Sequence, residues 1–178
     1  MTNRVWNSAR QLTLNCEGGF QCDPADDGNW TGGRVGKGKL VGTNHGISAA
    51  AYPNEDIVNM TQERAEYLYK RDYWDRCKCD QLPDCLSVAV FDFAINSGTD
   101  RAIKYLQIAL TGITVDGIIG NQTIGAANRM PPKQVLARYM DSRTDFIHKW
   151  AQNPKNKKFE PGIIKRIEKV RKFCEELI

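Results

Sequence analysis

Apolar residues recur at helical spacing along most of the chain, and one long polar, glycine-rich stretch near the N-terminus interrupts the pattern. A first helix is expected to begin at Asn3 and to end at Gly18-Gly19, because its apolar residues fall four, three and four positions apart. These apolar residues are Val5, Ala9, Leu12 and Cys16. Glu17 therefore lies at the predicted C-terminus of a helix.

Helical periodicity returns at Thr61 and continues to the end of the chain. Thr61 is a suitable N-cap for a helix that extends to Asp75. Segment 86–95 is apolar almost throughout, which predicts a buried helix around which the others pack. Further helices are predicted over 100–110, around 135–150 and over 163–177, with a polar loop at 153–161.

Between these regions, residues 18–48 are rich in glycine and polar side chains and predict loops or a short β-hairpin. Within them, Gly33-x4-Gly38-Lys39 has the glycine and lysine spacing of a phosphate-binding loop. Leu40 stands where such a loop needs a serine or threonine, and no strand precedes it, so nucleotide binding is not expected. We predict instead a basic flap over 32–40.

The glycine-rich stretch also contains the candidate chemistry. A helix C-terminus and apolar neighbours both disfavour an ionised carboxyl group, which raises the pKa of a residue placed like Glu17. Asp26 lies in a turn that we expect to be solvated, so it should stay ionised. One protonated and one ionised carboxyl group divide the work of glycoside hydrolysis, and the hydroxyl group of Thr43 could hold a water. The alternative is a glutamate at a helix end followed by ordinary turn aspartates.

The motif EGGF-x2-DP-x-D-x-G, followed by T-N-x-G-I-S, resembles the glycoside hydrolase 108 family of peptidoglycan N-acetylmuramidases, which includes phage endolysins. The resemblance implies that Glu17 is the proton donor, Asp26 its ionised partner and Thr43 the hydroxyl group that helps to hold water. The substrate contacts that we predict with it are Trp30, Asn44, Tyr52 and Asn96.

Two departures from the family pattern concern the loop that contains Asp26. Asn29 replaces the second loop glycine of the family, and residues 30–42 form an insertion. The insertion leaves open whether Asp26 or Asp27 faces the substrate.

Further along, residues 115–123 resemble an element of predicted peptidoglycan-binding lobes, with Asn121 in place of a proline. We therefore predict a mainly α, lysozyme-like fold with a small N-terminal active-site lobe, containing a loop or short β-hairpin, and a helical C-terminal lobe. The predicted regions are a catalytic region at 1–95 and a peptidoglycan-binding-like lobe at 96–178, which we expect to pack together.

The predicted reaction is hydrolysis of the β-1,4 bond between N-acetylmuramic acid and N-acetylglucosamine in bacterial cell walls. A lytic transglycosylase acting on the same bond and a non-catalytic wall-binding module are the alternatives. A zinc amidase is disfavoured because the chain has only two distant histidines, His45 and His148. We predict no metal, no cofactor, no nucleic-acid partner and no stable membrane insertion, and a monomer that acts on peptidoglycan glycan strands.

Composition adds the cellular setting. The chain is 41% hydrophobic and 26% charged, as in ordinary globular proteins, and no export signal is recognisable at its N-terminus. We therefore expect synthesis in the bacterial cytoplasm and action in the periplasm or cell wall, after release through a holin or a secretion system. Six cysteines would favour a disulfide in an oxidising compartment, with the pairing left open.

Overall fold

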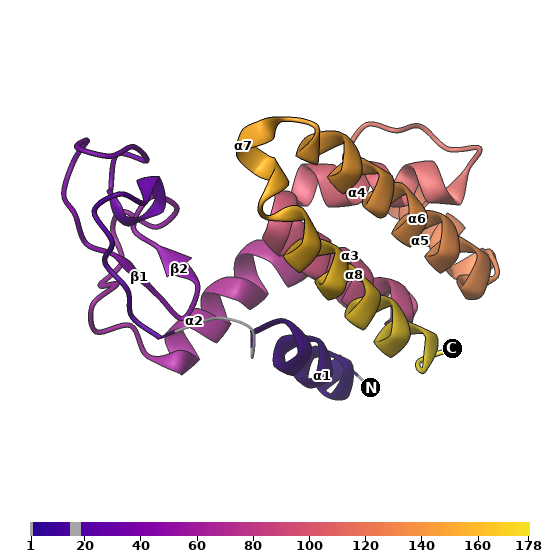
Figure 1. The fold of residues 1–178 in the computed structure, drawn as a ribbon. Coiled ribbons are helices and arrows are strands. Elements are labelled where there is room, and N and C mark those ends of the chain that lie inside the picture. Colours follow the sequence, from indigo (N-terminus) through magenta and orange to yellow (C-terminus); the bar gives the residue numbers. More distant parts are fainter. Residues whose placement is uncertain (1, 15–18) are drawn as a thin grey trace. The chain divides into compact units, whose positions relative to one another are not determined.

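The computed structural model is mostly helical and contains one two-stranded sheet (Figure 1). It describes the backbone of residues 2–14 and 19–178 and the side chains of 4–13 and 19–178. The chain forms two compact units, of which the larger comprises residues 1–9 and 71–178 and the smaller residues 10–70. This arrangement of helices with one small sheet confirms the predicted mainly α, lysozyme-like fold class. The boundary predicted at residue 95 stays a prediction.

The larger unit is built around helix α3 (Asp84–Ser97), as the apolar segment predicts. Every residue of α3 from Cys85 to Ala94 is buried. Helices α4 (Thr99–Leu110), α6 (Pro132–Ala151) and α8 (Glu160–Glu175) all pack against it, and α5 (Asn121–Arg129) packs against α4 and α6. A helix that is apolar on all sides needs such neighbours on all sides, because exposed apolar area is costly in water.

Aromatic side chains fill one part of this core. Trp6 of α1 (Thr2–Leu14) meets Trp74 and Phe91 edge to face, with ring centroids 5.3 Å apart in each pair. Trp74 belongs to a π-helical turn, Lys70–Asp75, and its indole nitrogen donates a 2.7 Å hydrogen bond to Asp80. Edge-to-face rings combine large buried area with favourable quadrupole contacts, so these residues tie the start of the chain to α3.

Helix α3 also contains one buried carboxylate, Asp92, which two arginines neutralise. Arg143 of α6 donates from Nη2 to Asp92 Oδ2 at 2.6 Å, and Arg166 of α8 donates from Nε to Oδ1 at 2.9 Å. Burial alone would raise the pKa of Asp92, but the charges and hydrogen bonds of the two guanidinium groups outweigh it and hold the pKa below its usual value. The ion pairs therefore join three helices through a single side chain.

The smaller unit has little regular structure. Strands β1 (Thr43–Asn44) and β2 (Ile47–Ser48) form an antiparallel hairpin in which Thr43 faces Ser48. The two residues of the turn, His45 and Gly46, both have positive φ, which matches the right-handed twist of a two-residue hairpin. The buried side chains of the smaller unit include Ile47, Ile57 and Leu68.

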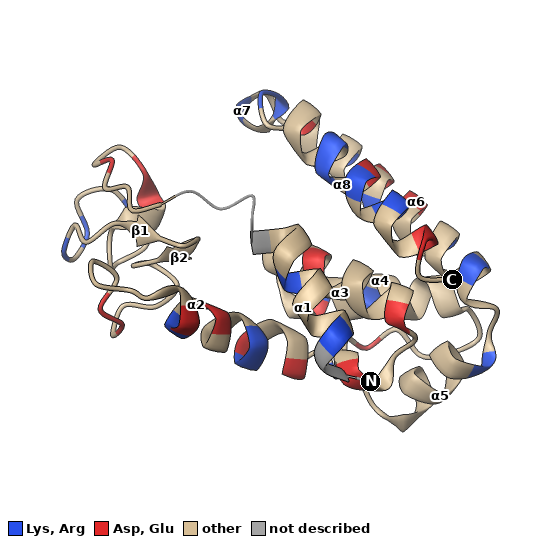
Figure 2. Ribbon diagram, turned by 90° about the horizontal axis from the view of Figure 1, so that it is seen from below, with Lys and Arg blue, Asp and Glu red and all other residues tan. Residues whose placement is uncertain are grey.

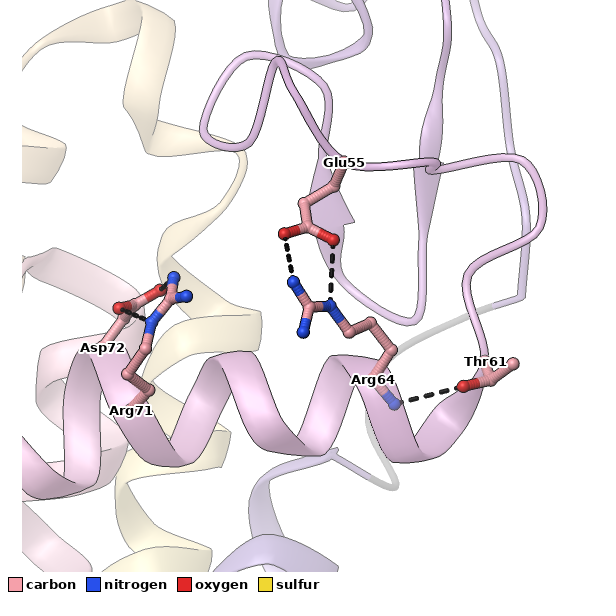
Figure 3. Close-up of polar contacts among 5 residues, drawn as sticks. All are labelled: Glu55, Thr61, Arg64, Arg71 and Asp72. Carbon is pink, nitrogen blue, oxygen red and sulfur yellow. Dashed lines mark hydrogen bonds and ion pairs between the residues drawn. The ribbon is translucent and has the colours of Figure 1, made fainter.

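Helix α2 (Gln62–Tyr69) belongs to this smaller unit and begins where the sequence predicts. Thr61 is the N-cap, and its hydroxyl oxygen accepts a 3.1 Å hydrogen bond from the backbone of Arg64 (Figure 3). The Arg64 guanidinium also holds the Glu55 carboxylate through two bonds of 2.7 and 3.0 Å. At the other end of the helix, Tyr69 donates to the backbone oxygen of His45 and so supports the hairpin turn.

Some details differ from the expectations. The segment predicted as a loop at 153–161 contains a short helix, α7 (Pro154–Lys157), capped by Asn153. Helix α4 begins at Thr99, one residue before the predicted start at 100, so Asp100 lies in its first turn. Figure 2 marks the Lys and Arg positions of α7 and α8 in blue. Two of those in α8 are ion-paired, Arg166 with Asp92 and Arg171 with Asp141.

Within the described residues, no helix combines the length and the apolar character that crossing a membrane requires. Five of the six cysteines are free thiols here (Cys22, Cys77, Cys79, Cys85 and Cys174), and Cys16 lies outside the described residues.

Replacing the buried carboxylate tests its structural role. Asp92→Asn should lower the free energy of unfolding by about 3–5 kcal/mol, because it leaves two guanidinium groups without their negative partner. Asp141→Asn is the matched control, since Asp141 pairs with Arg171 at the surface and should contribute less than about 1 kcal/mol. Denaturant unfolding measures both, and equal losses would contradict the assignment.

The same experiment has a defined pH dependence. Because the folded-state pKa of Asp92 lies below the unfolded-state value, its contribution is complete above that value, about 3.9, and is lost as pH falls through the folded-state value. The stability difference between the native chain and Asp92→Asn should therefore shrink below about pH 4.

Candidate active site

The turn that contains Asp26 is held by its own carboxylate. Asp26 has an extended backbone and is the N-cap of a 3-10 turn, Asp27–Asn29, with its Oδ1 accepting a 2.9 Å hydrogen bond from the Gly28 backbone. Aspartate is favoured at such a position because its short side chain satisfies a backbone donor two residues on. Asp26 is itself exposed, so its carboxylate is accessible.

Asn29, at the end of this turn, is the central residue of the site. It is fully buried, and its Nδ2 donates to the backbone oxygen of Asp23 at 2.9 Å and to Gln21 Oε1 at 2.8 Å. Since the Asp23 carbonyl can only accept, the amide orientation is fixed and Oδ1 must face the other way. There it accepts a 2.7 Å hydrogen bond from the Thr43 hydroxyl group.

Gln21 connects the same group to Asp26. Its Oε1 accepts from the Asp23 backbone at 3.0 Å, which fixes the orientation of its amide in turn. Its Nε2 therefore donates, to Asp26 Oδ2 at 3.2 Å and to Asn29 Oδ1 at 3.1 Å. The backbone of Gln21 also exchanges two hydrogen bonds with Thr43, of 2.9 and 2.8 Å. The buried amide of Asn29 and the exposed amide of Gln21 thus join the predicted partners Asp26 and Thr43.

This arrangement determines what Thr43 can do. Its single hydroxyl proton is committed to Asn29, so toward solvent its oxygen can act only as an acceptor. The carboxylate of Asp26 is an acceptor as well. A water placed between them would donate both hydrogens and keep its lone pairs for another atom.

Asp27 has a different role from Asp26. Its Oδ1 accepts a 2.8 Å hydrogen bond from the Val35 backbone, in the segment predicted as a flap. That flap, residues 32–40, is closed at its base by a hydrogen bond from the Thr31 backbone N–H to the Lys39 carbonyl and by a β-bridge between Trp30 and Leu40. Gly38 has a φ of +77°, and a Cβ there would lie 2.3 Å from the Thr31 hydroxyl oxygen, so a side chain is excluded.

The other predicted contacts lie in several places. Trp30 is half-buried and donates from its indole nitrogen to the Pro24 backbone at 3.0 Å, and Tyr52 is half-buried after the hairpin. Asn44 is 8% exposed, and its amide donates to the backbone oxygens of Ile57 and Val58. Asn96 belongs to the larger unit and accepts a 2.7 Å bond from Arg143. Glu17 lies outside the described residues.

Sequence reasoning did not assign a role to Gln21 or Asn29. The only signal was that Asn29 departs from the glycine of the family motif. Among the described residues, no group of three or more His, Cys, Asp or Glu side chains is arranged to hold a metal ion.

Comparisons with known proteins agree with the motif. The model of the glycosyl hydrolase 108 family matches residues 10–98, and a model described as a predicted peptidoglycan domain matches residues 101–168. Among solved structures, SagA of Brucella abortus is similar over 99% of this chain and 97% of its own, with 27% sequence identity and a TM-score of 0.78. No curated protein sequence matches significantly. The chain belongs to the glycosyl hydrolase 108 family.

Proposed function

We propose that this peptidoglycan hydrolase is an N-acetylmuramidase, which cleaves the β-1,4 bond between N-acetylmuramic acid and N-acetylglucosamine. The observation that carries the proposal is the amide-linked pair of acceptors, Asp26 and the Thr43 hydroxyl oxygen. Glycoside hydrolysis by direct attack needs a water whose hydrogens are held and whose lone pair is free.

In the proposed reaction, Glu17 donates a proton to the leaving glycosidic oxygen. Asp26 stabilises positive charge on the sugar ring, and with Thr43 it accepts the hydrogens of the attacking water. As the water adds to the sugar carbon, one of its protons passes to the Asp26 carboxylate. If the water attacks from the face opposite Glu17, the configuration at that carbon is inverted.

The proposal includes the biological setting expected from the sequence. The chain would act as a monomer in the periplasm or cell wall, after release through a holin or a secretion system, and the cleavage would be bacteriolytic, as for an endolysin.

Product analysis separates this function from its alternatives. Purified peptidoglycan is digested with the protein, and the fragments are identified by mass spectrometry. Reducing muramic acid ends would support hydrolysis, anhydromuramic ends would show a lytic transglycosylase, and unchanged glycan would show a binding module.

The role of Glu17 is tested by Glu17→Gln, which keeps the shape of the side chain and removes its acidic proton. Hydrolysis should fall by about two to four orders of magnitude, while the melting temperature stays near that of the native chain. Glu63→Gln, a change at an exposed residue of α2, is the matched control. A folded Glu17→Gln protein with more than about a tenth of the native activity would rule out the assignment.

The two neighbouring aspartates should respond differently. Asp26→Asn should lower kcat at least about 100-fold, since it removes the charge beside the sugar. Asp27→Asn should change kcat much less, because Asp27 binds the flap backbone and an amide oxygen can still accept that bond. Steady-state assays of both variants measure the two losses of kcat. A larger loss in Asp27→Asn than in Asp26→Asn would show that Asp27, and not Asp26, is the ionised partner of Glu17.

Asn29 is predicted to be a positioning residue. Asn29→Ala removes the acceptor of the Thr43 proton, so kcat should fall about 10- to 100-fold with little change in KM. Asn128→Ala is the matched control, because it removes another asparagine amide with two donor bonds, to the backbone oxygens of Gln81 and Ile124, and it should leave kcat unchanged.

A second substitution at Asn29 gives a readout that a purely structural role would not change. Asn29→Asp keeps the acceptor but adds a carboxylate near Asp26, which favours the protonated form of Asp26. The acid limb of the kcat/KM profile should therefore move to higher pH. An unchanged pH profile would show that Asn29 acts only in folding.

A further inference from the structure

The larger unit contains a second candidate site, a pocket of about 320 Å³. Four helices meet at this pocket: α3 at its end, α4 at its start, α6 in its second half and α8 at its start. Six of its lining residues supply charge, hydrogen-bonding groups or apolar surface. They are Asn96, Arg101, Arg143, Phe146, Trp150 and Ile163. Its volume is at the lower end of the range for small-ligand sites, on the order of 300–1,000 Å³.

Arg143 is the unusual member of this lining. It is fully buried, and its Nη2 is bonded to Asp92 and Asn96 at 2.6 and 2.7 Å. Its Nε and Nη1 are also buried, and among the described residues neither has a hydrogen-bond partner. The ring of Phe93 lies 4.9 Å from the guanidinium carbon, but a ring face does not replace acceptors for these two nitrogens.

Buried donors without acceptors are rare, because each costs about 1–3 kcal/mol when left unpaired. Since Arg143 lines the pocket, acceptor atoms of a ligand in the pocket would complete its hydrogen bonding.

The charge around the pocket favours an anion. Arg143 brings one positive charge to the lining, and it shares the carboxylate of Asp92 with Arg166. Arg101 adds another, held over the Phe146 ring at 4.7 Å and bonded to the Ser97 backbone. The described lining residues include no Asp or Glu.

The walls indicate what the anion is attached to. Phe146, Trp150 and Ile163 present aromatic and aliphatic surface, which suits a small apolar group beside the charge. A peptide with free carboxylates has all the required parts: negative charge, carbonyl acceptors and methyl or methylene groups. The glycan strand of peptidoglycan has no negative charge where its lactyl groups bear peptides, so the stem peptides are the better match.

We propose that this pocket binds a carboxylate of the peptidoglycan stem peptide, with Arg143 and Arg101 as its anion-binding residues. The inference rests on the proposed function only in that it takes peptidoglycan as the substrate. It assigns peptide recognition to residues of the larger unit, whereas Asp26 and Thr43 belong to the smaller unit.

The test measures the binding of ligands to the full chain by titration, monitored in ¹H–¹⁵N NMR spectra. The probe is the stem tripeptide L-alanyl-γ-D-glutamyl-L-lysine, with two comparison ligands. One is the same tripeptide with its carboxyl groups amidated, and the other is the disaccharide N-acetylglucosaminyl-N-acetylmuramic acid with a free lactyl carboxylate. The tripeptide should shift the Nε–H resonance of Arg143 and the indole resonance of Trp150, and the two comparison ligands should not.

Substitutions measure how much each lining residue contributes to tripeptide binding. Arg101→Gln should weaken tripeptide binding up to about five-fold, as expected for an exposed charge, whereas Arg138→Gln, outside the pocket, should leave it unchanged. Arg143→Lys keeps the charge but removes Nε and Nη1 as donors, and should weaken binding at least about ten-fold. Ile163→Trp fills the pocket from α8 and should abolish binding without touching either arginine.

Each other result overturns the proposal. Equal shifts with the amidated peptide would show that charge is not recognised, and shifts with the disaccharide alone would assign the pocket to the lactyl carboxylate. Binding that resists both Arg101→Gln and Ile163→Trp would place the peptide elsewhere. Because none of these measurements requires turnover, they stand even if product analysis shows a transglycosylase or a binding module.

Discussion

The larger unit depends on the neutralisation of one buried charge. Asp92 lies in the middle of α3 between apolar residues, where an ionised carboxylate without partners would be strongly unfavourable. Its two arginines come from α6 and α8, 51 and 74 positions further along the chain. Apolar packing alone tolerates small shifts of one helix along another, whereas these bonds require a single register of the three helices. The same bonds leave Nε and Nη1 of Arg143 without partners among the described residues, so the group that orders the core also supplies the donors of the proposed anion-binding pocket.

The smaller unit solves a different problem. It positions the proposed catalytic groups, Asp26 and Thr43, with little regular structure, in a segment whose backbone would otherwise have many conformations. Side-chain amides hold this unit together where regular structure is lacking. Asn29 and Gln21 bond to each other and to backbone and side-chain groups of the turn and of Thr43, and these bonds fix the orientation of both amides and of the Thr43 hydroxyl group. Preorganisation of this kind matters for catalysis because bonds already formed need not be reorganised during the reaction.

The helices could be predicted because their signals are local. The spacing of apolar residues and the Thr61 cap can be read from a few neighbouring positions of the sequence. The mostly apolar sequence of α3 likewise predicts that this helix is buried. The order of Glu17, Asp26 and Thr43 could be read only through a family motif. The amide network could not be predicted, since Gln21 and Thr43 pair across 22 positions through backbone contacts that no local pattern indicates. The burial of Arg143 could not be predicted either, because an arginine in an amphipathic helix such as α6 is expected on the exposed polar face.

The flap has an uneven tolerance for change, which bears on how the family can diversify. Gly33 and Gly36 have positive φ, but added side chains would meet nothing there within 4 Å, whereas at Gly38 the Thr31 hydroxyl group occupies the space. A Cβ at Gly33 or Gly36 would therefore cost backbone strain alone, whereas the base of the flap at Gly38 has no room for one beside Thr31. Natural variation or engineering of this loop would begin at its tip, and a change that moves the Val35 backbone would reach the turn that contains Asp26 through the Asp27 carboxylate.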